Sequence, residues 1–183
     1  MRAFLSLDLP EACLDALVAR IGGLRAGRRV PPENLHLTLS FLDDQPEEAL
    51  EDLHVALEAL SLPAVPLHFG GLEWFGPGHA RMLAVVLEPV ADLMTLQSEV
   101  ERQARKHGLR PEKRPFRPHV TLVRFRAKMS AEDQGALAAF LAAPPVVEGP
   151  DALATSFSLQ GSALTHAGAR YQALAIYPLR QPG

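Results

Sequence analysis

Apolar residues in this chain follow two different periods, and each period predicts one kind of element. Alternating apolar and polar positions predict strands near residues 2–8, 65–75, 81–88, 119–126, 153–161 and 170–178. Apolar residues at helical spacing predict helices near residues 10–20, 46–60, 90–107 and 130–142. A further strand is expected just after the polar loop 25–33, where aliphatic residues again alternate with polar ones.

The order of these elements predicts an α+β fold. The two halves of the chain have a roughly similar order of elements: strand, helix, strand and helix in the first, and helix, strand, helix and strands in the second. No low-complexity linker separates the two halves. We therefore expect residues 1–183 to form a single compact domain made of two lobes.

Composition narrows the class of protein. With 183 residues, of which 48% are hydrophobic and 21% charged, the chain can bury one sizeable core. Its apolar runs are too short for a membrane span, and the first residues read as a strand and not as a leader. The single cysteine, Cys13, excludes an intrachain disulfide framework and falls on an apolar helix face. We expect a cytoplasmic monomer.

Two strand regions carry the same four-residue pattern, His36-Leu37-Thr38-Leu39 and His119-Val120-Thr121-Leu122. Successive side chains of a strand point to opposite faces, so each histidine shares a face with its threonine while the aliphatic residues point the other way. Each strand thus offers an imidazole and a hydroxyl on one face. Since histidine titrates near neutral pH, two such strands indicate a matched acid–base pair.

Charge is unevenly distributed around the second pattern. The formal net charge is −3, which argues against an obligate binder of long nucleic acid. Residues 105–128, however, contain one acidic residue, Glu112, and nine basic ones: Arg105, Lys106, Arg110, Lys113, Arg114, Arg117, Arg124, Arg126 and Lys128. Taken singly, each of these is explained as part of a solvated loop, but as a cluster beside His119 they favour anion binding.

The sequence gives no support for a metal site or for a nucleotide-cofactor site. The remaining histidines have no carboxylate at metal-ligand spacing: His54, His68, His79, His107 and His166. The chain has no Gly-x-Gly-x-x-Gly, Walker-type or His-Glu-x-x-His pattern. We therefore expect no metal and no cofactor.

The two patterns and their flanks resemble the two-histidine (2H) phosphoesterase superfamily, and within it the LigT-like RNA 2′,3′-cyclic phosphodiesterases, historically called 2′-5′ RNA ligases. The resemblance runs over nearly the whole chain. It rests on Arg2-Ala3-Phe4, on residues 32–42 around the first histidine, on residues 116–124 around the second, and on Gly168-Ala169-Arg170-Tyr171.

This resemblance implies a bilobal fold with a pseudo-twofold axis, in which two antiparallel-rich sheets face a central cleft and helices lie outside. It implies metal-independent opening of a 2′,3′-cyclic phosphate, on an RNA 3′ end or a small nucleotide, to leave a 2′-phosphate. His36 is then the proton donor and His119 the proton acceptor. Thr38 and Thr121 would bind the non-bridging oxygens, Arg124 the phosphate, and Phe41 the nucleobase.

Two of these residues have a competing interpretation. Strict alternation from His119 places Val123 and Phe125 on the face of Thr121 and sends Arg124 to the core, so Arg124 reaches a phosphate only if the strand ends, bulges or twists just after Val123. Arg117 and Arg126 are the alternatives. Phe41, for its part, is in phase with Leu37 and Leu39 and could pack in the core.

The chain departs from the family pattern at two places. Many relatives have Phe-Leu-Gly-Glu where this chain has Phe41-Leu42-Asp43-Asp44, and a tryptophan is common where Arg28-Arg29 stands. Neither change touches the proposed acid, base or threonines. Both leave the preferred length of the substrate open.

Three alternative functions remain. RNA 2′-5′ end-joining runs through the same transition state in reverse. A 2′-5′ oligoadenylate or a cyclic nucleotide of metabolism is another substrate for the same chemistry. A non-catalytic module that binds RNA ends is a candidate of a different class, although such a module would not require two histidines.

Overall fold

The computed structural model describes residues 1–76, 81–112, 115–126, 128–142, 152–165 and 168–181. Its helices are α1 (Glu11–Arg20), α2 (Glu47–Glu58), α3 (Ala91–Lys106) and α4 (Ala131–Ala142), with a 3₁₀ turn, η1, at Pro32–Asn34. Its strands are β1 (Arg2–Leu7), β2 (Arg28–Arg29), β3 (Leu37–Asp44), β4 (Val65–Leu67), β5 (Phe69–Phe75), β6 (Met82–Leu87), β7 (His119–Arg124), β8 (Ala152–Ala154), β9 (Ser156–Thr165) and β10 (Gly168–Pro178). The predicted α+β order is confirmed. His79, His166, Lys113 and Arg114 lie outside the described residues.

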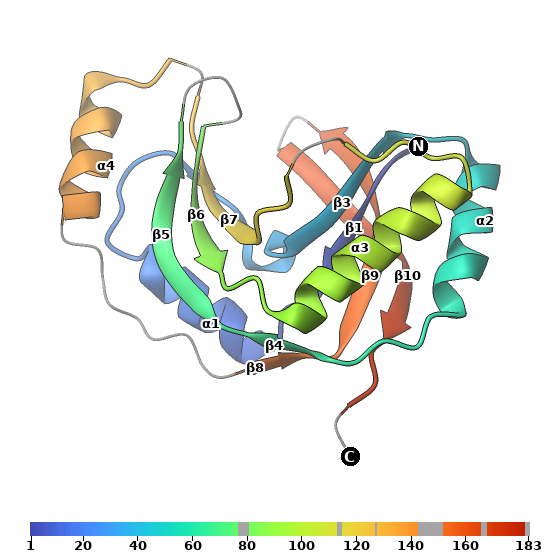
Figure 1. The fold of residues 1–183 in the computed structure, drawn as a ribbon. Coiled ribbons are helices and arrows are strands. Elements are labelled where there is room, and N and C mark those ends of the chain that lie inside the picture. The colour runs from blue at the N-terminus through green and yellow to red at the C-terminus, as the bar shows by residue number, and fades with distance from the viewer. Residues whose placement is uncertain (77–80, 113–114, 127, 143–151, 166–167, 182–183) are drawn as a thin grey trace.

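Within the described residues, the large sheet has the strand order β10-β9-β1-β3-β7-β6-β5, with β2 added beside β7. All its pairings are antiparallel. The strands β10-β9-β1-β3 and the strands β7-β6-β5 are joined through β3 and β7, which share one register pair, Leu37 with Val120. We call β1, β3, β9 and β10 the first lobe and β2, β5, β6 and β7 the second lobe; they stand at the right and left of Figure 1.

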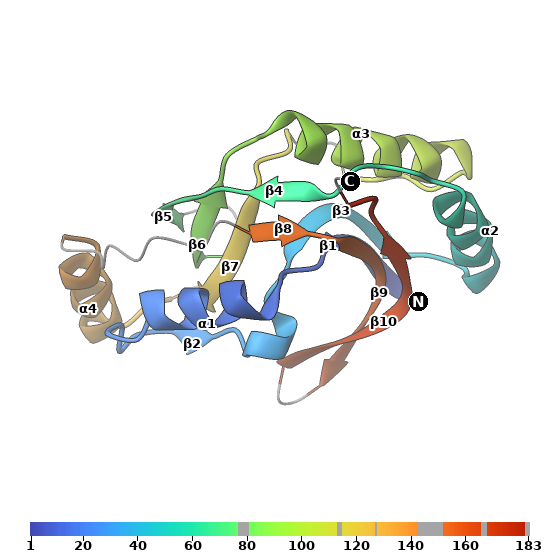
Figure 2. The same cartoon turned by 90° about the horizontal axis from the view of Figure 1, so that it is seen from below.

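The two lobes are not the two halves of the sequence. The C-terminal strand β9 pairs with the N-terminal strand β1, which completes the first lobe around the first histidine pattern. β4 and β8 form a separate antiparallel ribbon, which lies along the bottom of the molecule in Figure 1 and across the middle of the view from below in Figure 2. Chain order alone does not give this interleaving, because it depends on strand pairing between distant segments.

Helices cover the outside of both lobes. α3 packs on β3 and also contacts α2, and these two helices lie over the first lobe in Figure 1. α2 buries Leu50, Leu53 and Leu57, the helical repeat that the sequence predicts. α1 is tied to the second lobe by Arg20, whose Nη1 donates to the carbonyl of Gly70 on β5 at 2.9 Å.

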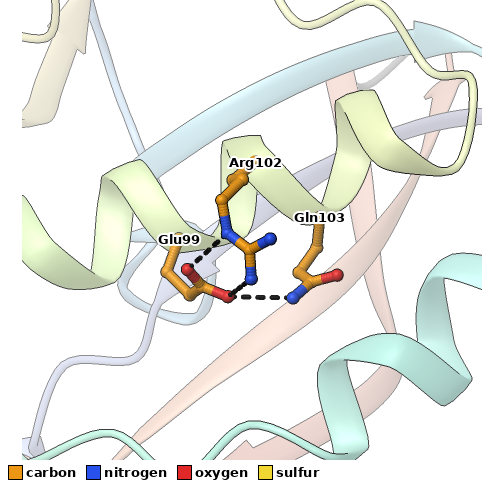
Figure 3. Close-up of polar contacts among 3 residues, drawn as sticks. All are labelled: Glu99, Arg102 and Gln103. Carbon is orange, nitrogen blue, oxygen red and sulfur yellow. Dashed lines mark hydrogen bonds and ion pairs between the residues drawn. The ribbon is translucent and has the colours of Figure 1, made fainter.

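α3 carries a local polar network that joins an exposed arginine to one partly buried and one buried side chain, drawn in Figure 3. Arg102 donates from Nε and Nη2 to the Glu99 carboxylate at 2.8 and 2.6 Å, and Gln103 donates to the same carboxylate at 2.8 Å. These hydrogen bonds, above all that of Arg102, hold the pKa of Glu99 below its usual value. Because Arg102 is exposed, the pair supports the helix only modestly.

The buried residues of both lobes form one continuous cluster. Leu5 and Leu37 of the first lobe and Leu83 and Leu122 of the second are fully buried within it. Cys13 is buried too, and burial raises the pKa of its thiol, so the prediction of a core cysteine is confirmed. In the part of the chain that the structure describes, no helix is long and apolar enough to cross a membrane.

Candidate active site

The register between β3 and β7 relates the two His-x-Thr patterns. Leu37 and Val120 are directly opposed in an antiparallel pair. Extending this register by one residue in each direction sets His36 opposite Thr121 and Thr38 opposite His119. The sheet face that carries these four residues is called here the motif face.

Each histidine is anchored through its Nδ1 atom by the same local contact. Nδ1 of His36 lies 2.8 Å from the carbonyl oxygen of Asn34, and Nδ1 of His119 lies 2.7 Å from that of Arg117. A carbonyl can only accept, so Nδ1 carries the proton in both rings. Nε2 is then the basic nitrogen of each neutral imidazole, the atom at which the ring can take up a proton and, once protonated, give it away.

The two histidines have different surroundings. The His36 ring packs at 4.9 Å from Phe4 and edge-on at 5.3 Å from Tyr171. His119 stacks at 4.9 Å on Phe75, whose other neighbour is the guanidinium of Arg117 at 5.0 Å from the ring centroid. Arg117 is also ion-paired with Glu73.

Burial lowers the pKa of both histidines. The pKa of His36 falls to about 4, chiefly through desolvation; the Asn34 carbonyl opposes this, while the charges of Arg124 and of a protonated His119 add to it. The pKa of His119 is also lowered, first by burial and then by the charges of Arg117 and Arg124, against the effect of its bond to the Arg117 carbonyl. Both rings are therefore neutral near pH 7 in the free protein.

The threonines make different contacts in the two lobes. Thr38 Oγ1 lies 3.1 Å from Nε2 of His36 and donates to it in the neutral tautomer. Thr121 Oγ1 donates to Met82 Sδ at 3.2 Å, a weak bond to a thioether. Both hydroxyls belong to half-buried residues beside the histidines.

A β-bulge changes the expected direction of Arg124. In the β6–β7 pairing, Leu83 faces Val123 and Ala84 faces Thr121, so Leu122 is the extra residue. Leu122 and Val123 are consequently both buried, and Arg124 returns to the motif face. The expectation that Val123 shares the face of Thr121 is wrong, and the required bulge lies one residue earlier than expected.

The position of Arg124 is consistent with a role at both histidines, because its charge lowers the pKa of each. Its cross-strand neighbour on β2 is Arg28, so both arginines lie on the same face of the sheet. Arg29, the next residue, instead donates to the carbonyls of Gly22 and Leu24 and fixes the loop. Sequence reasoning did not connect Arg28 with Arg124.

The described residues of the basic cluster do not all lie at the site. Arg105 pairs with Glu101 along α3, while Arg117 and Arg124 lie near His119. Part of the cluster therefore serves the surface of a helix, and the anion-binding prediction rests on Arg117 and Arg124.

Phe41 does not pack in the core as the alternative interpretation expected. Its exposed fraction is 46%, because a bulge at Leu39 shifts the strand by one residue and turns Phe41 to the motif face. There it lies opposite Phe4, with ring centroids 6.2 Å apart. An exposed ring next to Phe4, which itself packs against His36, is available for stacking.

Several residues of the site had no role assigned from sequence. Phe4, Tyr171 and Phe75 form the aromatic surroundings of the two histidines. Tyr171 falls in a segment that supports the family resemblance, but no spacing rule links it to His36, since the contact depends on β10 pairing with β9. Among the described residues, no group of three or more His, Cys, Asp or Glu could hold a metal.

The fold and the site together define a class of protein. Its members are α+β proteins in which two strands with the same His-x-Thr pattern, here at β3 and β7, lie side by side in antiparallel pairing. Residues 13–150 match the family model of the 2′-5′ RNA ligase superfamily, and the chain belongs to that family.

Curated relatives are similar to this chain in sequence over nearly its full length. The chain is 30% identical to the RNA 2′,3′-cyclic phosphodiesterase of Thermus thermophilus, with 98% of this chain and 91% of the relative covered. It is 28% identical to the protein of the same name from Escherichia coli K12, covering 98% and 97%.

Solved structures show the same fold. The crystal structure of E. coli LigT in apo form superposes with a TM-score of 0.78 at 25% identity, covering 98% of both chains. A crystal structure of a protein from T. thermophilus superposes with a TM-score of 0.80 at 27% identity over 100% of both chains.

Proposed function

We propose that this protein is an RNA 2′,3′-cyclic phosphodiesterase that hydrolyses the cyclic phosphate at an RNA 3′ end, or on a small nucleotide, to a 2′-phosphate. The observation that carries the proposal is the mirrored register of the two His-x-Thr strands, with Nδ1 of each histidine fixed by a carbonyl. Relatives over most of the chain bear this name, and E. coli LigT has been crystallised with 3′-AMP.

In-line attack on phosphorus requires a base at the entering water and an acid at the leaving oxygen, on opposite sides of the phosphate. His119 would accept the proton of the water, and His36 would protonate the leaving 3′-oxygen, each step contributing typically about 10²–10⁴-fold in rate. Thr38, Thr121 and Arg124 would bind the non-bridging oxygens, on which negative charge must be held through the reaction.

The low pKa of His36 must be reconciled with its role as an acid. A neutral imidazole with a pKa of about 4 suits a base better at pH 7. A phosphate bound beside it raises this pKa, because the anion stabilises the imidazolium and offsets the charge of Arg124. The substrate itself therefore prepares the acid, and the free protein does not hold the proton.

The test is hydrolysis, in excess EDTA, of a short RNA ending in a 2′,3′-cyclic phosphate. We expect release of a 2′-phosphate by the natural protein, loss in His36→Ala and His119→Ala, and full activity in His68→Ala, which removes an exposed histidine from the loop between β4 and β5. Binding of the labelled RNA without turnover would contradict the proposal and support a binding module.

End-joining is the second candidate, because the matching family model is named for 2′-5′ RNA ligases. It needs the same groups, with a 5′-hydroxyl in place of water. Adding a 5′-hydroxyl RNA to the same reaction distinguishes end-joining, which gives a joined RNA, from hydrolysis, which gives a 2′-phosphate. Hydrolysis is expected to dominate, since water is in large excess over any RNA end.

A further inference from the structure

A cavity of about 290 Å³ opens beside His36, and none of the described residues that line it belongs to β5, β6 or β7. Its polar lining consists of Asp8, Glu33, His36, Gln160 and Tyr171. Leu9 and Leu14 are among its apolar lining residues. The proposed phosphate chemistry leaves this cavity unexplained.

The cavity is built by contacts between distant segments. Asp8 accepts hydrogen bonds from Ser156 and Ser158, each at 2.8 Å, so its carboxylate is fixed at the end of β1. On the opposite side, Asn34 of η1 donates to the carbonyl of Ala169 on β10 at 3.3 Å. The wall that carries Glu33 is thereby tied to the strand that carries Tyr171.

The lining selects against an anion and for a group that donates hydrogen bonds. Two carboxylates, which act only as acceptors when ionised, repel a phosphate and bind adjacent N–H groups. The Gln160 amide can donate or accept, and the aliphatic and aromatic walls suit a flat ring. A nucleobase with donors on one edge meets all these conditions.

The cavity and Phe41 lie at opposite ends of the first-lobe site. Phe41 is opposite Phe4 on β1, while Asp8 lies four residues further along the same segment. Four strand residues span about 13 Å. A phosphate and ribose held at His36 and Thr38 would lie between the two, with one base on each side.

We propose that this cavity binds the base of the nucleotide that precedes the cyclic-phosphate end, and that it prefers guanine. Guanine presents N1–H and the N2 amino group side by side, which a carboxylate accepts as a bidentate pair. Adenine and cytosine offer one amino group, and uracil one N–H. This inference rests on the proposed function, since it assumes that the cyclic phosphate occupies the motif face.

The experiment compares kcat/KM for dinucleotides NpU that end in a 2′,3′-cyclic phosphate, where N is guanosine, inosine, adenosine, cytidine or uridine. We expect guanosine to be preferred over cytidine about tenfold, as for a hydrogen bond to a charged group. Inosine lacks the N2 amino group and should lose most of this preference, a result that needs no protein variant.

Glu33→Gln removes one carboxylate from an exposed turn, so the fold should tolerate it. The ratio of guanosine to cytidine substrate should fall toward one in this variant. Glu47→Gln, which removes an exposed carboxylate from the first turn of α2, should leave the ratio unchanged. Taking ratios removes any general effect of a substitution on turnover.

Three results with the dinucleotides would overturn the inference: equal turnover for every N, equal use of guanosine and inosine, or a guanosine preference that Glu33→Gln leaves intact. A guanosine preference among mononucleotide 2′,3′-cyclic phosphates would also overturn it, because the cavity would then hold the terminal base. Failure of the proposed function is a separate result, namely no turnover of any cyclic phosphate by the natural protein.

Discussion

Leu39 and Leu122 occupy the same position in the two His-x-Thr-Leu patterns, and each is the extra residue of a β-bulge. Both are buried. The bulge shifts the alternation by one residue, so the fifth residue after each histidine turns to the motif face. These residues are Phe41 and Arg124, and the same backbone device thus brings an aromatic ring to one lobe and a guanidinium to the other.

The assignment of acid and base predicts selective rescue by a better leaving group. A substrate with sulfur in place of the bridging 3′-oxygen expels a thiolate, which needs no proton from the protein. His36→Ala should lose about 10²–10⁴-fold in rate on the oxygen substrate and regain most of it on the sulfur substrate. His119→Ala should be slow on both. Rescue of His119→Ala alone would reverse the two roles, and single-turnover rates measure the difference.

Arg124 should act both through its charge and through its geometry. Arg124→Gln is expected to lower kcat/KM about 10²-fold, as when an oxyanion donor is removed. It should also raise the pKa of both His36 and His119, since the Arg124 charge lowers both. NMR titration of the two rings checks this shift.

Arg124→Lys is the matched control for this prediction. It keeps the charge and loses the planar fork, so the two pKa values should stay low while activity still falls. Unchanged histidine titration in Arg124→Gln would contradict the position assigned to Arg124.

The lowered pKa of His36 predicts a specific loss of stability in acid. An unfolded histidine has a pKa near 6.5, whereas folded His36 has a pKa of about 4. As the pH falls from 6.5 to 4, the unfolded state takes up the proton first, so the free energy of unfolding decreases by about 3 kcal/mol in total. Above pH 7 the protonation of His36 does not change the free energy of unfolding, because the ring is neutral in both the folded and the unfolded state.

Urea unfolding of the natural protein and of His36→Gln between pH 4 and 8 measures this effect. The natural protein should lose more stability than the variant below pH 6.5. His119 titrates in both proteins, so its contribution cancels in the comparison. Parallel curves for the two proteins would show that His36 titrates normally.

Phe41 should contribute to substrate binding and little to stability. Its ring is exposed, and stacking on one base is worth about 1–3 kcal/mol in other proteins. Phe41→Ala should therefore raise KM for a cyclic-phosphate RNA about tenfold or more, with a melting temperature close to that of the natural protein. Ile176→Ala, at an exposed aliphatic residue on β10, should change neither quantity. A large loss of stability in Phe41→Ala would instead favour a packing role.

The continuous core predicts that both lobes unfold together as one domain. Leu37 is fully buried at the pair that joins β3 to β7, and its truncation to alanine should lower the free energy of unfolding by about 2–5 kcal/mol. Hydrogen exchange should then show faster opening in β1 and β6 alike. Faster exchange confined to the first lobe would indicate two independent domains.

Local sequence patterns predicted the helices, most of the strands and a hypothesis about the chemistry. Helical patterns located the four helices to within a few residues, because that period follows from local backbone geometry. The strand patterns were less complete: the strands expected at 65–75 and 153–161 are each divided between the large sheet and the β4–β8 ribbon, and β2 lies in the segment expected to be a loop. The repeated pattern at His36 and His119 was enough to indicate the acid–base pair, because a histidine and a hydroxyl on one strand face are a local property of the chain.

Pairing between distant segments instead decides where three side chains of the site lie, namely those of Phe41, Arg124 and Tyr171. The direction of the first two depends on bulges at Leu39 and Leu122, which arise from pairing with β1 and β6 and leave no local signal. Tyr171 reaches His36 because β10 pairs with β9 and β9 with β1, across most of the chain. The cavity at Asp8 and Glu33 exists for the same reason, since its walls come from segments that meet only in the folded sheet.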